Sequence, residues 1–382
     1  MTGSQLLRSH TFRIVSTINR KIYVFSNLSR TTMDSVPWKF VDSVVDLFSK
    51  RTLQQLAQEV RRSLWKDVVD LHRRNRVYYR VDFRMEEGGI KHVFKNGTEV
   101  DLSINMRTIR EKGRFARISL VSDSTTDRDL SYFNAHFDPF NRYIFNWDGV
   151  EPLGEAETAK LLETISPQID PASCCFQSFT GSPDCTRVLL TSLFKRVYLQ
   201  RITVLFCGQI AYDFLEDQIN NSPFLSNVTI SGKNWPTPTP DLLMKLCLKG
   251  RPGKLVGVCV YDGIHLDSNY IQNLFDLWKE NGNLQFELFS FPHILDKKGL
   301  HALMSKGKLL RSAKRASWIR DEISFFEHGT EKSVAILSDD GCLIRCFTCE
   351  CDTSKKCLFK ERSPRLHKLQ KNGMLVNDGL DF

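Results

Sequence analysis

The chain has 382 residues, enough for two or three domains, and its composition of 41% hydrophobic and 25% charged residues is ordinary for a globular protein. It contains no apolar run of about eighteen residues, so the sequence predicts no membrane-spanning helix. The net charge of +9 does not demand a nucleic-acid partner, because five positive charges lie among residues 1–32 and the rest of the chain carries +4.

The eleven cysteines are an odd number and follow no regular framework. Such cysteines are typical of reduced thiols inside the cell. We therefore expect an intracellular protein, cytoplasmic or nuclear.

Residues 1–32 are rich in Arg, Ser and Thr and contain no acid. This composition is typical of a mitochondrial transit peptide, and equally of an extension ahead of a start at Met33, where the charge pattern changes. We favour a basic, disordered extension over residues 1–32.

Residues 33–78 contain three short helical patterns with almost no loop between them. The first spans 37–48, where Pro37 suits a first helical position. The second begins at Thr52, which can form a capping box with Gln55, and the third begins at Ser63. Helices this short cannot bury their apolar stripes alone, so they must pack on one another, on the next domain or on a partner.

This helical block resembles an F-box. It has the apolar–Pro pair Val36-Pro37, an amphipathic helix, a Leu-x-x-Leu helix at Leu53 and a Leu-Trp pair at Leu64, although Thr52 stands where an acidic residue is usual. The chain also resembles nematode-expanded families in which a degenerate F-box precedes a leucine-rich-repeat-like region. The resemblance implies docking on the adaptor of a cullin–RING ligase through Pro37, Phe40, Val41, Val44, Leu53, Leu56, Leu64 and Trp65. The alternative is a helical cap on a globular domain.

Residues 79–114 are predicted to form a small β-meander and a linker. Apolar residues alternate on both sides of Asn96-Gly97, the strongest hairpin-turn signal in the chain. A basic run follows at 107–117. A phosphate-binding patch is one interpretation of this run, but a solvated helix and loop is the commoner outcome.

Residues 115–306 alternate between β-like runs and helical patterns at a spacing of about 25–32 residues. The β-like runs centre near Ile118, Ile144, Phe176, Thr203, Val228, Gly257 and Phe286. The clearest helical stripe is Ile271, Leu274, Phe275 and Trp278. This period predicts a leucine-rich-repeat-like horseshoe, and an α/β fold with helices on both faces of a parallel sheet is the alternative.

A horseshoe would expose every second strand residue on its concave face. The inward sets are apolar, as in Val256, Val258 and Val260 of the 255–261 strand. The outward sets mix polar groups with aromatic anchors, which is typical of a recognition surface. We expect a target protein to contact Thr229, Tyr261, Glu287 and Phe289 unless helices cover this face.

After the repeats, a basic linker or helix over residues 306–320 and three short strands predict a β cap over residues 307–360. Residues 361–382 are polar and basic with little periodicity, so we expect a disordered tail.

One group of residues invites a metal: Cys342, Cys346, Cys349, Cys351, Cys357 and then His367. Zinc favours pairs spaced as Cys346 and Cys349 are, but the surrounding spacing is irregular and alternation along a strand would point these two to opposite faces. We therefore predict plain strand and loop cysteines and no bound metal.

Catalytic signatures are absent from the sequence: there is no dinucleotide-binding glycine motif, P-loop, His-Glu-x-x-His or Gly-x-Ser-x-Gly. The pair His265 and Asp267 in a predicted loop is too common to indicate catalysis. We therefore expect no enzymatic activity and no cofactor.

Together these patterns predict an α/β protein with a short N-terminal F-box-like helical block, leucine-rich-repeat-like β/α repeats and a C-terminal β cap. The resemblance implies a non-catalytic substrate-recognition subunit of a cullin–RING (SCF-type) ubiquitin ligase, which binds an unidentified target protein through its repeats. Two alternatives remain open: a protein-interaction module with no ligase link, and a nucleic-acid binder that uses the basic runs at 107–117 and 306–320.

Overall fold

The structure is a computed structural model that describes residues 36–61, 63–97, 99–125, 147–179, 181–291, 296–311, 322–339, 341–352 and 357–371. The chain divides into two compact units between Asn75 and Arg76, close to the boundary predicted at residue 78. The predicted basic extension, residues 1–32, lies outside the described residues. Within the described ranges, no helix has both the length and the apolar character needed to cross a bilayer.

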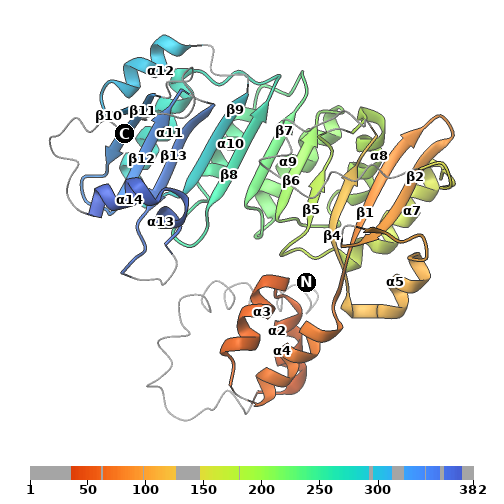
Figure 1. The fold of residues 1–382 in the computed structure, drawn as a ribbon. Coiled ribbons are helices and arrows are strands. Elements are labelled where there is room, and N and C mark those ends of the chain that lie inside the picture. Colours follow the sequence, from red (N-terminus) through yellow and green to blue (C-terminus); the bar gives the residue numbers. More distant parts are fainter. Residues whose placement is uncertain are drawn as a thin grey trace, which may run out of the picture. The chain divides into compact units, whose positions relative to one another are not determined.

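In the described chain the N-terminal unit consists of α2 (Trp38–Asp46), α3 (Lys50–Glu59) and α4 (Ser63–Asn75) (Figure 1). Helix α3 begins before the predicted Thr52, because the Ser49 side chain accepts a hydrogen bond from the Thr52 N–H and caps the helix. The three helices share a small core made of Val41, Val45, Leu53, Val68 and Val69.

A buried histidine also joins two of these helices. His72 of α4 is fully buried, and its Nε2 lies 3.0 Å from a carboxylate oxygen of Asp42 on α2. This polar contact supplements an apolar core that is small for an independent unit.

The second unit is mixed α/β. Its strands are β1 (Val77–Glu86), β2 (Gly89–Asn96), β3 (Glu99–Val100), β4 (Ala116–Asp123), β5 (Cys175–Gln177), β6 (Arg201–Leu205), β7 (Asn227–Ser231), β8 (Val256–Tyr261), β9 (Phe286–Phe291), β10 (Lys308–Arg311), β11 (Glu322–Glu327), β12 (Ser333–Ser338) and β13 (Cys342–Thr348). Its helices are α5 (Met106–Lys112), η2 (Gly113–Phe115), α7 (Glu155–Ile165), η3 (Ser166–Gln168), α8 (Pro183–Leu193), α9 (Gln209–Asn221), α10 (Thr239–Cys247), α11 (Ser268–Asn281), α12 (Lys297–Met304), α13 (Leu358–Arg362) and α14 (Pro364–Lys371).

All the described strands form one sheet, in the order β10-β11-β12-β13-β9-β8-β7-β6-β5-β4-β1-β2-β3 (Figure 1). Strands β1 and β4–β9 run parallel to one another. Antiparallel strands extend the sheet beyond β1 on one side and beyond β9 on the other. The predicted meander at 79–114 is thus no separate module: β1 lies beside β4 in the main sheet.

From β4 to β9 each strand pairs with the next one in the chain, and a helix lies between each pair in sequence. Right-handed crossovers that always advance in one direction keep their helices on one face. Side chains from helices α7 to α11 accordingly share a single core with the predicted inward strand residues, among them Ile202, Val228 and Val258. The β-like run near Ile144 lies outside the described residues, and β4 pairs directly with β5.

The opposite face carries a second, smaller core at the C-terminal end of the sheet. Along β12, Ala335 and Leu337 join the main core, while Val334 and Ile336 join Phe347 of β13 and Phe359 of α13 in the second one. Helix α13 therefore covers the face opposite α11 at this end of the sheet.

Two sequence predictions for this region need correction. Residues 364–371, predicted to be disordered, form α14, which places His367 in a buried position. Residues 308–311, predicted to belong to a basic linker or helix, form β10, which pairs with β11. In both places the tertiary contacts outweigh the polar local composition.

Candidate functional site

The predicted adaptor-binding residues fall into two groups in the N-terminal unit. Pro37 and Phe40 are exposed, with 45% of Phe40 accessible, and Leu56, Leu64 and Trp65 are partly buried. Val41, Val44 and Leu53 are buried, which corrects their assignment to a docking surface. A charged residue at any of these three buried positions would test folding rather than docking.

One side of α2, together with its C-cap residue, presents exposed apolar side chains that belong to the amphipathic helix of the F-box-like pattern. Phe40 and Leu47 are exposed by 45% and 38% and stand seven residues apart, so they share one stripe of the helix. Trp38, also exposed, stands two residues before Phe40 and points to a different side. The stripe from Phe40 to Leu47 is hereafter the α2 stripe.

The predicted target-binding residues lie on the sheet face opposite the main core. Pairing places Thr229, Cys259 and Phe289 in one row across β7, β8 and β9. Thr229 and Phe289 are partly exposed, as predicted for an outward set.

Glu287 lies next to the covered part of this face. It pairs in register with Arg345 of β13, and burial raises the pKa of its carboxyl group, opposed by the nearby guanidinium groups of Arg362 and Arg345. Because Arg362 belongs to α13, the open part of the outward face ends beside β9.

Tyr261 is the exception in the outward set, because it is only 8% exposed. Its ring stacks on Phe291 at a centroid distance of 5.1 Å and meets Phe179 edge-on at 4.9 Å. No helix is needed to bury it: aromatic neighbours on the same face do so. Tyr261 is therefore a packing residue and not an exposed anchor.

We expect Tyr261→Ala to lower the free energy of unfolding by about 3 kcal/mol, because it removes a buried ring from a cluster of three aromatic rings. Thr229→Ala, on the neighbouring strand, should change it by less than about 0.5 kcal/mol. Urea denaturation followed by circular dichroism measures both. A Tyr261→Ala protein as stable as Thr229→Ala would contradict the packing role.

The basic run at 107–117 is divided between the surface and the interior. Arg107 is exposed on α5 and pairs with Glu111. Arg117 is buried in β4, where its guanidinium donates to the backbone carbonyls of Arg114 and Ala116. Residues 107–117 therefore present fewer positively charged side chains on the surface than the basic sequence predicts.

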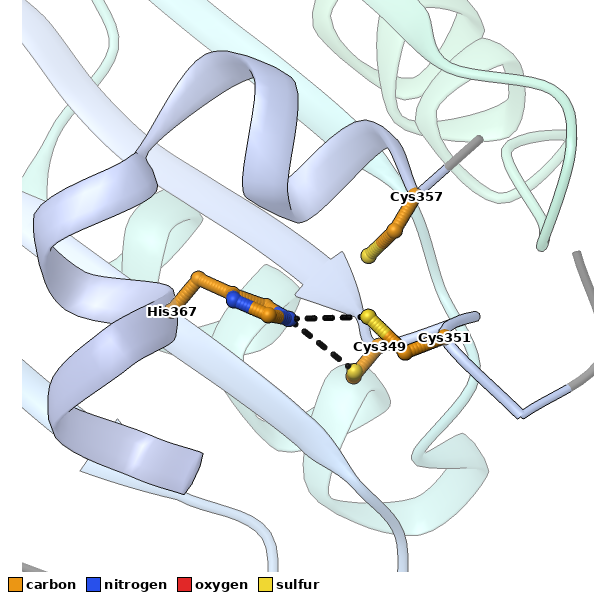
Figure 2. Close-up of side chains that lie close together, drawn as sticks. All are labelled: Cys349, Cys351, Cys357 and His367. Carbon is orange, nitrogen blue, oxygen red and sulfur yellow. Dashed lines mark hydrogen bonds between the residues drawn. The ribbon is translucent and has the colours of Figure 1, made fainter. Parts of the chain in front are cut away.

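The cysteine-rich segment yields a compact cluster that the sequence prediction missed. Cys349, Cys351, Cys357 and His367 place one ligand atom each within 4.8 Å of all the others. Figure 2 shows the four side chains pointing toward one another. We call these four residues the Cys3His cluster.

The elements that build the Cys3His cluster come from three places in the chain. Cys349 and Cys351 follow β13, Cys357 precedes α13 as its N-cap residue, and His367 lies on α14. Cys346, which the sequence paired with Cys349, is fully buried in the main core. The prediction of opposite faces for this pair holds, but Cys346 was the wrong partner to consider.

The electrostatics of the Cys3His cluster follow from burial. Burial lowers the pKa of His367, helped by Lys371 and Lys360, so its imidazole is neutral at neutral pH. Burial raises the pKa of the Cys349 thiol to about 11. A neutral imidazole with an available lone pair is the form that ligates metals.

Comparisons with models of known protein families, with curated proteins and with solved structures found no match for this chain.

Proposed function

We propose that this chain is a substrate-recognition subunit of a cullin–RING ubiquitin ligase, in which the N-terminal unit docks on the adaptor and the second unit binds a target protein. The observation that carries the proposal is the α2 stripe. In the three short helices with the F-box-like pattern, Phe40 near the start of α2 and Leu47 at its C-cap are exposed by 45% and 38%. Exposed large apolar side chains on a small helical unit are typical of a protein-binding surface.

The second unit supports this proposal through its strand order. Neighbouring strands β4–β9 follow one another in the chain, with their intervening helices in one core. We take this arrangement for a leucine-rich-repeat-like horseshoe with irregular repeats, a class of fold whose strand face commonly binds proteins. Thr229, Phe289 and Glu287 would contact the target there.

The mechanism would be proximity and not catalysis by this chain. A target held on the sheet face and an adaptor held on α2 belong to one assembly, so the target's local concentration near the ubiquitin-loading machinery rises. Neither contact requires a reactive side chain.

We expect the variant Phe40→Glu with Leu47→Glu to bind the purified adaptor about a hundredfold more weakly than wild type, because two apolar contacts of about 1.4 kcal/mol each are replaced by charges. Both positions are exposed, so the unit should stay folded. Titration calorimetry of the full-length chain with the adaptor measures the affinity.

Leu248→Glu is the matched control, since Leu248 of the second unit has the same 38% exposure as Leu47. It should leave the affinity unchanged. Wild-type protein that fails to bind the adaptor at micromolar concentration, or a double variant that binds as tightly as wild type, would refute the ligase function.

A further inference from the structure

We propose that the Cys3His cluster is a structural zinc site, formed by the Sγ atoms of Cys349, Cys351 and Cys357 and the Nε2 atom of His367. This site is independent of the adaptor contact, because its four ligands all belong to the second unit. It replaces the expectation from the sequence that no metal is bound.

Two sulfur–nitrogen distances in the cluster lie close to those of a zinc tetrahedron. Zinc lies about 2.3 Å from thiolate sulfur and about 2.0 Å from imidazole nitrogen, so S–N edges of about 3.5 Å and S–S edges of about 3.8 Å result. The Sγ atoms of Cys349 and Cys351 lie 3.3 Å and 3.2 Å from Nε2 of His367. All four ligand atoms lie within 4.8 Å of one another, so an ion at their centre would draw them closer together.

The surrounding residues hold the ligands in place. The Glu350 N–H donates to Sγ of Cys357 at 3.4 Å, a contact that favours a thiolate at that sulfur. The His367 ring meets Phe359 edge-on at 5.3 Å, and Phe359 stacks on Phe347 of β13. These contacts orient the His367 ring, and Figure 2 shows its Nε2 atom in contact with the sulfurs of Cys349 and Cys351.

The ligand set identifies both the metal and its role. Three soft thiolates and one imidazole in a tetrahedron favour zinc over magnesium or calcium, which prefer oxygen. Four protein ligands leave no open position for water or substrate, which is the mark of a structural site. The ion would fasten α13 and α14 to the end of β13, where the second core contains few residues.

The test is elemental analysis of untagged, full-length protein purified under reducing conditions without added metal. We expect one zinc per chain in wild type. Cys351→Ser and His367→Ala should each retain less than about a tenth of that amount, because three remaining ligands bind zinc far more weakly. Cys175→Ser and His301→Ala, which alter a half-buried cysteine and an exposed histidine outside the cluster, should keep the full zinc content.

A spectroscopic measurement covers the case in which a ligand variant fails to fold. Wild-type protein stripped of metal and titrated with cobalt(II) should give the visible bands of tetrahedral cobalt together with sulfur-to-cobalt charge-transfer bands. Wild type without zinc and without these bands would overturn the proposal. So would a disulfide between two cluster cysteines in freshly purified protein, or variants that retain zinc in full.

Discussion

Removing zinc should make residues 357–371 cleavable by trypsin about a hundredfold faster than in the metal-bound protein. A ligand present at about a hundred times its Kd stabilises the state that binds it by about 2.7 kcal/mol, and cleavage follows the population of the opened state. Trypsin sites in this stretch are Lys360, Arg362, Arg365, Lys368 and Lys371. Mass spectrometry of timed digests, with and without a chelator, measures the rate at each site.

The helices between the parallel strands β4–β9 supply the internal control for this experiment. Lys245 of α10 and Lys279 of α11 lie outside the second core, so cleavage after them should not depend on metal. Acceleration at all sites alike would show that the chelator unfolds the whole unit. Equal rates within 357–371 with and without chelator would mean that zinc does not fasten α13 and α14.

Trp278→Ala should lower the free energy of unfolding of the second unit by about 3–5 kcal/mol. Trp278 of α11 is 1% exposed, packs against Phe275, and donates its indole N–H to Oγ of Ser333 on β12 at 2.8 Å. It therefore joins α11, the helix before the last parallel strand, to the antiparallel strand β12. Chemical denaturation followed by tryptophan fluorescence or circular dichroism measures the change.

Trp278→Phe separates the two contributions of this side chain. It keeps most of the apolar contact but leaves the buried Ser333 hydroxyl without its donor, which should cost about 1–3 kcal/mol. Glu280→Ala, at an exposed position two residues further along the same helix, is the control and should be nearly neutral. A Trp278→Ala protein within about 1 kcal/mol of wild type would contradict its structural role.

Local periodicity was enough to predict the middle of the chain. The stripe from Ile271 to Trp278 forms α11, and the alternation of Val256, Val258 and Val260 gives the side of β8 that faces the main core. Such patterns depend on neighbours a few residues away, so a single sequence contains them. Sequence alone did not decide between helices on one face and on two, because that choice depends on the order in which strands pair.

The misassigned residues share one physical cause. Val41 and Leu53 match the F-box-like pattern as Phe40 does, but an apolar residue can face a core or a partner, and the pattern does not distinguish them. Tyr261 was taken for an exposed anchor because its cover comes from Phe179 and Phe291, on other strands and loops.

The Cys3His cluster was missed because its geometry is set by tertiary structure. The spacing from Cys349 to His367 matches no common pair motif, and His367 was placed in a disordered tail. Only when α14 folds back does its ring reach the thiols after β13. The density of cysteines between Cys346 and Cys357 was the one signal in the sequence that could have found the site.

The order of the strands also bears on how the protein avoids self-association. A large sheet with bare edges invites the edge of another copy, and polymerisation follows. Among the described strands, the sheet ends at β3, which has two residues, on one side and at β10, which has four, on the other. Edges this short offer few backbone groups for pairing with a second copy. Concentrated solutions should therefore resist edge-to-edge fibre growth despite the length of the sheet.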